Sequence, residues 1–134
     1  MQAKDKTALS AVRLNHAEEC LRAAKSLIVG ESYKSAANRA YYCVFHAMRA
    51  VLALDGIDMK HHSGIISEFR RLYIKTGFLD VSLSETISLL SDMRTDSDYD
   101  DFFVISKSEA AEGVKDAEAF LSAVRSFLTE NNHN

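Results

Sequence analysis

Arg39, Tyr42 and His46 are spaced three and four residues apart, so in a helix they form one line along a single face. A guanidinium binds phosphate with its planar fork, and a histidine that titrates near neutrality can move a proton. The line therefore fits a phosphate-cleaving site in which Arg39 holds the phosphate and His46 transfers the proton. From spacing alone we favour the other interpretation, a half-buried polar seam in which Arg39 pairs with an aspartate of another helix.

Arg94 is the second candidate, because it continues an apolar helical stripe where an unpaired guanidinium is costly to bury. Asp98 lies one turn further on, within the acidic run 96–101, and Tyr99 follows it. An ion pair of Arg94 with Asp98 would contribute only about 0.3–0.5 kcal/mol to the helix. Alternatively, carboxylates hold Arg94 at an interface where its fork binds a phosphate. The sequence leaves both interpretations open.

Two patterns that contain metal-binding residue types make poor metal sites. His61 and His62 are adjacent in a loop, and neighbouring side chains do not easily ligate one ion. We predict instead that His62 packs or hydrogen-bonds at the start of the next helix. The run from Asp96 begins like a calcium loop, but Asp101 replaces the required glycine and Lys107 replaces the terminal glutamate. We therefore expect no metal and no cofactor.

The composition favours one helical domain over residues 1–134, with its core between about residues 10 and 128. The chain has no proline and five glycines, which favours long uninterrupted helices. Its net charge of −3 argues against non-specific coating of nucleic acid but leaves room for a local basic cleft. Without an apolar leader or a stretch long enough to span a bilayer, we expect a cytoplasmic protein with no membrane contact, and Cys20 and Cys43 as buried free thiols.

The elements that must position these side chains are five predicted helices. Apolar residues at helical spacing place them over 7–29, 32–54, 63–76, 82–95 and 106–128. Two of the starts read as capping boxes: Ser82 with Glu85, and Ser106 with Glu109. Short connections favour an all-α fold, an antiparallel up-and-down four-helix bundle with an additional short helix.

The sequence resembles the HEPN domain family of small helical proteins in three stretches: NRAYYCVFHAMRAVL, KHHSGIISEFRRLYIKTG and MRTDSDYD. The resemblance covers roughly Ser10 to Leu128 and is greatest to stand-alone proteins of the toxin–antitoxin, nucleotidyltransferase-associated type. It implies a four-helix bundle with an extra short helix, and usually a homodimer. Many members are metal-independent ribonucleases, often toxins that a neighbouring minimal nucleotidyltransferase neutralises.

In this family the active site is an arginine followed four to six residues later by a histidine, and two such motifs meet across the dimer. The resemblance assigns the arginine to Arg94, whereas the histidine position falls at Asp98 or Tyr99. Tyrosine titrates at a pH of about 10, so it is a poor base near neutrality. A second match is Arg39 with six residues between it and His46, on the second predicted helix and away from the family's usual place.

From these residues we predict a dimeric HEPN module, non-catalytic or weakly catalytic, that acts with a nucleotidyltransferase-type partner in a toxin–antitoxin manner. The alternative is a metal-independent toxin ribonuclease, in which Arg94 or Arg39 holds the scissile phosphate of RNA and His46 transfers the proton. A third interpretation is a bundle that binds a small molecule or a nucleotide with the same arginines and the aromatic pair Tyr41 and Tyr42. In some family members the partner enzyme adenylylates a tyrosine beside the motif, which suggests Tyr99 as a modified residue.

Overall fold

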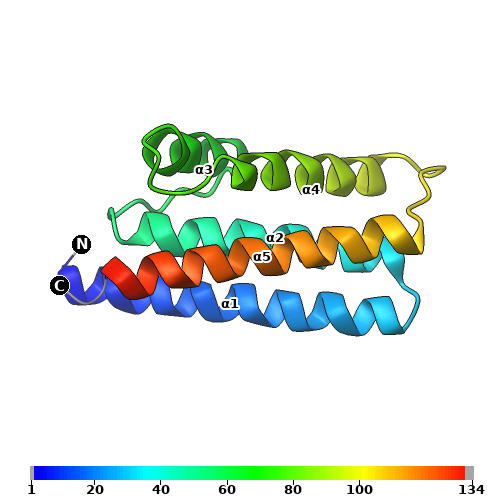
Figure 1. Cartoon of the computed structure of the whole chain (residues 1–134), viewed down its shortest axis with the longest axis horizontal. Coiled ribbons are helices and arrows are strands. Elements are labelled where there is room, and N and C mark those ends of the chain that lie inside the picture. The colour runs from blue at the N-terminus through cyan, green and yellow to red at the C-terminus, as the bar shows by residue number, and fades with distance from the viewer. Residues whose placement is uncertain (1, 132–134) are drawn as a thin grey trace.

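The structure, a computed structural model, describes residues 2–131 and confirms the all-α prediction (Figure 1). The fourth helix contains Asp96 and Asp98, which were expected to end it. The third continues without interruption into a π-helical segment, which is labelled η1. The elements are α1 (Ala3–Val29), α2 (Tyr33–Ala53), α3 (His62–Phe69), η1 (Arg70–Ile74), α4 (Ser82–Tyr99) and α5 (Lys107–Asn131).

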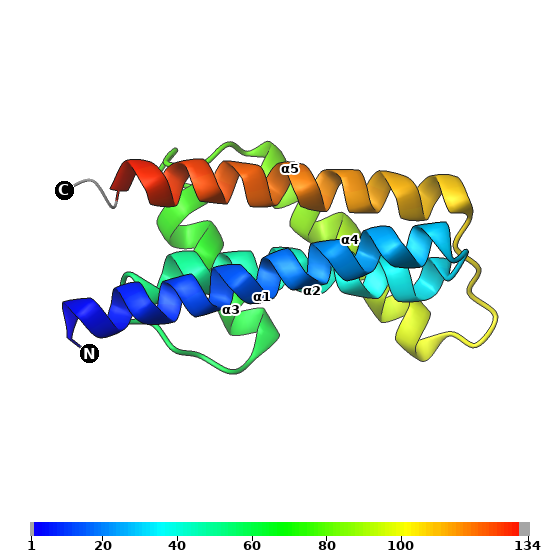
Figure 2. The same ribbon diagram turned by 90° about the horizontal axis from the view of Figure 1, so that it is seen from below.

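The central helix of the bundle is α2, which contacts α1, α3, α4 and α5. Figures 1 and 2 show α1, α2 and α5 running along the long axis, with α3 and α4 on the side of α2 away from α1. The turns from α1 to α2 and from α4 to α5 lie at the same end. No helix in the described part of the chain is long and apolar enough to cross a membrane.

Burial along α2 is almost complete and leaves one polar line at the surface. Small alanine side chains let neighbouring helices approach α2 closely, and Tyr41 and Met48 fill the larger spaces. Cys20 and Cys43 are buried free thiols, as predicted. Beyond its first turn, α2 keeps five side chains partly exposed. We call them the α2 polar face: Asn38, Arg39, Tyr42, His46 and Arg49.

The two predicted capping boxes have different outcomes. At the start of α5, Glu109 N–H donates to Ser106 Oγ (3.0 Å) and Ser106 N–H donates to the Glu109 carboxylate (3.4 Å), which confirms that box. The box at Ser82 is wrong, because the N-cap of α4 is one residue earlier and makes no side-chain cap. There the Ser82 N–H donates to Asp80 Oδ2 (3.0 Å), since the preceding turn brings that carboxylate to the helix start.

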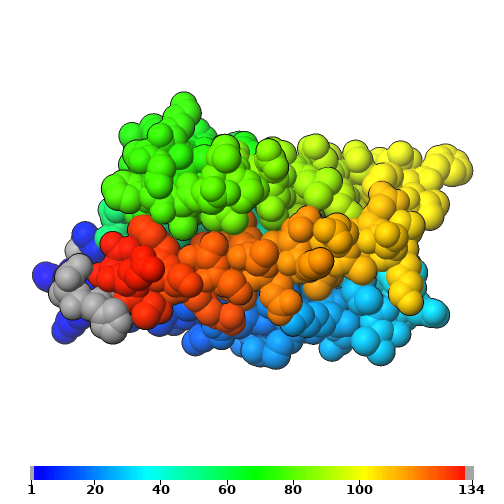
Figure 3. Space-filling model, in the orientation of Figure 1, coloured from blue at the N-terminus to red at the C-terminus, as the bar shows by residue number. Residues whose placement is uncertain are grey.

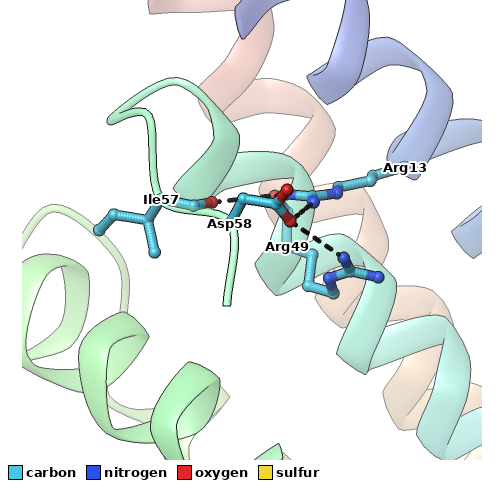
Figure 4. A network of polar contacts seen from close by, with 4 residues as sticks. All are labelled: Arg13, Arg49, Ile57 and Asp58. Atoms are coloured by element: carbon cyan, nitrogen blue, oxygen red, sulfur yellow. Dashed lines mark hydrogen bonds and ion pairs between the residues drawn. The ribbon is translucent and has the colours of Figure 1, made fainter. Parts of the chain in front are cut away.

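The loop between α2 and α3 is fixed by a buried arginine of α1 (Figure 4). Arg13 is 4% exposed and donates to the carbonyl oxygens of Arg49 (3.2 Å) and Ile57 (3.5 Å). It also pairs with Asp58 Oδ1 at 2.5 Å. Because these bonds hold the loop against α1 and α2, they determine where α3 begins and so where His62 lies.

Candidate functional site

Arg94 of α4 lies against two aromatic rings of α2. Its guanidinium carbon is 5.1 Å from the ring centroid of Tyr41 and 5.5 Å from that of Tyr42. Each such cation–π contact contributes about 0.5–1 kcal/mol at an exposed site and more when desolvated. The tyrosine pair therefore explains how a guanidinium continues the apolar stripe of α4.

The predicted pair of Arg94 with Asp98 is present but leaves the guanidinium incompletely bonded. Arg94 Nε lies 3.4 Å from Asp98 Oδ2. The same nitrogen is buried and has no hydrogen-bond partner, because the geometry of this contact is that of an ion pair only. Arg94 is thus held mainly by the two aromatic rings, and its buried Nε is a donor without a hydrogen-bond partner.

Arg39 shares the ring of Tyr42 with Arg94. Its guanidinium carbon is 5.2 Å from the Tyr42 centroid, and its Nε and Nη2 donate to Asn38 Oδ1 (3.2 and 2.8 Å). Arg39 therefore bonds its neighbour on the same helix, whereas the polar-seam interpretation predicted a pair with an aspartate of another helix. Arg39 also lines a cleft of about 370 Å³ between α2 and α4, together with Leu27, Lys34, Ser35, Asn38, Ser97 and Asp98.

His46 is held in its neutral form. Burial lowers its pKa to about 4, and the charges of His16, Arg49, Arg39 and Arg13 add to the shift. Its Nδ1 is buried without a partner, and its ring meets the His16 ring edge-on at 5.5 Å. At neutral pH His46 can accept a proton only weakly and carries almost none to donate, so it is poorly suited to acid–base chemistry.

His62 contacts the ring system under Arg94 directly. Its Nδ1 lies 2.8 Å from the Tyr41 hydroxyl, and its ring stacks on Phe45 at 4.1 Å. Burial, then Arg94 and Arg49, lowers the pKa of His62, while burial raises the pKa of Tyr41. The hydrogen bond at the helix entrance was predicted. That its partner is the tyrosine beneath Arg94 was missed, because Tyr41 lies on the apolar stripe and reads as core.

The structure brings four of the five sequence candidates together and separates the fifth. Arg39, Asp98 and Arg94 converge around Tyr42, and His46 packs on the same ring with a centroid distance of 6.1 Å. Tyr99 is 82% exposed and is the last residue of α4. Figure 3 shows the segment that joins α4 to α5, coloured yellow, at one end of the molecule. In residues 2–131, no group of three or more potential metal ligands converges. The arrangement can bind an anion with arginines on an aromatic platform.

Comparisons with known proteins agree with this architecture. The HEPN domain family model matches residues 10–127. A putative toxin of Methanocaldococcus jannaschii is 34% identical over 89% of this chain and 81% of its own length. A UPF0332 protein of Thermotoga maritima is 31% identical over 85% of this chain and 86% of its own length. A second putative toxin of M. jannaschii is 31% identical over 85% of this chain and 84% of its own length.

Proposed function

This chain belongs to the HEPN domain family, and we propose that it is a toxin-type module that binds RNA phosphate at Arg94. In this proposal it forms a homodimer, is itself non-catalytic or weakly catalytic, and acts with a nucleotidyltransferase-type partner. The observation that carries the proposal is the Arg94 guanidinium on the Tyr41 and Tyr42 rings, beside the cleft that Arg39 lines. A guanidinium held in place on aromatic rings loses little freedom when it binds a phosphate.

The weak catalysis follows from the state of the only histidine on the α2 polar face. With its pKa lowered to about 4, His46 is protonated in about one molecule per thousand at pH 7. Ribose-assisted cleavage of RNA needs a base for the 2′-hydroxyl and an acid for the leaving oxygen, each titrating near the working pH. A site with Arg94 and a neutral, desolvated His46 therefore holds a phosphodiester better than it cleaves one.

Two observations support the toxin–antitoxin setting. Two relatives that match over more than four fifths of this chain carry the name putative toxin. Tyr99, the tyrosine nearest the family motif, is 82% exposed, and Phe102 and Val104 beside it are 93% and 80% exposed. A partner enzyme could reach the Tyr99 hydroxyl without any change in the fold, as modification by a nucleotidyltransferase would require.

The test is to induce the chain in cells with and without a nucleotidyltransferase expressed from an adjacent gene, and to purify it for RNA binding and cleavage. We expect slow or no cleavage by the wild type, RNA binding that Arg94→Ala abolishes, and little change for His46→Ala. Arg125→Ala is the matched control, because Arg125 pairs with Glu18 on the surface of other helices. Rapid cleavage that His46→Ala abolishes would replace this proposal by the ribonuclease that uses His46.

The contact between Tyr41 and His62 favours a different form of the ribonuclease as second candidate. Arg94 acts on the pKa of His62 and of Tyr41, whereas the cations that act on His46 do not include Arg94. If the chain cleaves RNA, proton transfer beside Arg94 then belongs to His62. Cleavage lost in His62→Ala and kept in His46→Ala would establish this form, and the reverse pattern would exclude it.

A further inference from the structure

A second cationic surface lies outside the α2 polar face, along the helix formed by α3 and η1. It is a groove of about 460 Å³, and we call it the α3–η1 groove. The stretch 60–75 carries four cationic side chains against the one carboxylate of Glu68, a net +3, in a chain whose net charge is −3. The groove is lined by Ser63, Ile66, Ser67, Arg70, Arg71 and Lys75.

Arg70 is fixed in the groove by three hydrogen bonds to α4. Its Nε donates to Ser84 Oγ (2.9 Å), and its Nη2 donates to the Ser84 carbonyl (3.1 Å) and to Ser88 Oγ (2.7 Å). All of these acceptors are neutral, so the positive charge is not compensated, and Nη1 is left for a ligand. Arg70 also begins the π-helical segment, a rare geometry that occurs often at functional sites.

The other two cations of the groove keep donors available as well. Arg71 donates from Nε (3.1 Å) and Nη2 (2.7 Å) to the carboxylate of Glu68, which leaves its Nη1 unused. Lys75 is exposed at the end of the groove and forms no ion pair with any other described residue. Three cations against one carboxylate leave the groove with an excess of two positive charges.

Two features connect this groove to a single nucleic-acid strand. Phe78 follows η1 and is 66% exposed, so its ring offers a face on which an unpaired base can stack. Arg70 is bonded to Ser88 of α4, and Arg94 is six residues further along the same helix, which is about 9 Å along its axis. Arg94 also lies about 120° around α4 from Ser88, so a strand that reaches both arginines has to cross the helix surface between them.

We propose that the α3–η1 groove is a second phosphate-binding site, which holds the backbone of a single-stranded RNA at a distance from Arg94. This inference rests on the proposed function in one respect, that the ligand is RNA. The guanidinium groups of Arg70 and Arg71 bind phosphate oxygens, and Lys75 adds a point charge at the end of the groove. The site raises affinity for longer strands and takes no part in any proton transfer.

The test is a fluorescence-anisotropy titration of the full chain with a labelled single-stranded oligouridylate over a range of salt concentrations. The groove variant is Arg70→Gln/Arg71→Gln/Lys75→Gln. The control Lys4→Gln/Lys107→Gln/Lys115→Gln removes the same charge from exposed positions elsewhere. Each phosphate contact contributes about −0.7 to the slope of log K against log salt for a single strand. We expect the groove variant to reduce that slope by about 2 and the affinity at least tenfold, with no change for the control.

Loss of the Arg70 bonds to α4 could itself disturb the fold, so a second variant keeps them. Arg71→Gln/Lys75→Gln leaves Arg70 in place, and its slope should fall by about 1.4. Unchanged affinity and slope in both groove variants, with binding weakened by Arg94→Gln, would overturn the groove and leave the proposed function standing. Failure of the wild type to bind the oligonucleotide would overturn both, whereas loss of binding in the groove variants alone would support the groove and contradict a site at Arg94.

Discussion

Arg13 and Arg94 are both largely removed from solvent, and their surroundings differ in kind. Arg13 meets two backbone carbonyls and a carboxylate of its own chain (Figure 4). Arg94 meets the faces of Tyr41 and Tyr42 and one carboxylate at ion-pair distance, and its buried Nε has no hydrogen-bond partner. The Arg13 guanidinium is bonded to groups of its own chain, whereas the Arg94 guanidinium is positioned by the fold and its Nε has no hydrogen bond.

The difference follows from what each arginine has to hold. Arg13 ties the loop after α2 to α1 and α2, so its Nη1 and Nη2 donate to two backbone carbonyls and a carboxylate of its own chain. Arg94 packs against rings, which accept a cation over a broad area and demand no particular hydrogen bond. A guanidinium held on rings can bond an incoming phosphate without breaking hydrogen bonds to its own chain. The position on two tyrosine rings, together with the unbonded Nε, is therefore what distinguishes Arg94 from Arg13.

The largest effect should come from Arg13→Ala. The change removes the donor to the carbonyls of Arg49 and Ile57 and leaves Asp58 only its longer contact with Arg49 (3.5 Å), so we expect a loss of about 3 kcal/mol in the free energy of unfolding. Arg94→Ala should cost about 1 kcal/mol, since it loses ring contacts and a weak pair. Urea unfolding measures both, with Arg13→Lys as the control that keeps charge and stem. Equal losses of unfolding free energy for Arg13→Ala and Arg94→Ala would contradict the distinction drawn between the two arginines.

Much of the helical framework that positions Arg13 and Arg94 could be predicted from the sequence, because it depends on local patterns. The apolar stripe of α2, the end of α1 at Gly30 and the capping box at Ser106 follow from spacing and residue type. The start of α4 was wrong at Ser82, since a side chain of the preceding turn, Asp80, supplies the hydrogen bond there.

The parts of the site that could not be predicted are contacts between distant residues. Spacing placed Arg39, Tyr42 and His46 on one face, but it cannot say that Arg94 crosses to the same ring. It also cannot say that His62 reaches Tyr41, since that contact depends on how the loop after α2 is folded. Helical periodicity assigns a residue to a face, and only packing decides which other face it meets.

The next effect concerns His46, whose pKa is lowered by the Arg13 region and not by Arg94. Burial is the largest cause, followed by the charges of His16, Arg49, Arg39 and Arg13. Its folded pKa of about 4 is below the unfolded value of 6.5, so the unfolded state takes up the proton first as the pH falls. The stabilising contribution is complete above pH 6.5 and is lost as the pH falls toward 4.

We expect this loss to be on the order of 2 kcal/mol, after allowance for partial exposure of the ring. Urea unfolding at a series of pH values should show a smaller decline for His46→Gln than for the wild type. The difference between the two proteins isolates His46 from His62 and the carboxylates, which titrate in both. Parallel curves for the two proteins would mean that the desolvation of His46 is not maintained in solution.

A smaller effect should separate the two tyrosines under Arg94. Tyr41→Phe keeps the ring and removes the hydroxyl that meets His62 Nδ1, so we expect a loss of about 1 kcal/mol in the free energy of unfolding. Tyr42→Phe is the matched control, since the cation–π contacts of Arg94 and Arg39 use its ring rather than its hydroxyl. Its stability should change by less than about 0.5 kcal/mol. A reversed order would show that the hydroxyl of Tyr42, rather than that of Tyr41, supports the platform.

The smallest effect on stability is expected for Asp98→Asn, which removes the only carboxylate paired with Arg94 in the described structure. An i, i+4 pair at a partly exposed position contributes about 0.3–0.5 kcal/mol, so unfolding should change little. Phosphate binding should instead strengthen about twofold, because the competing anion is gone and the guanidinium stays on its rings. Asp92→Asn on the same helix is the control for charge alone. Weaker binding in Asp98→Asn would mean that Asp98 orients Arg94 for its ligand, and the site arginine would then resemble Arg13 more closely than its unbonded Nε indicates.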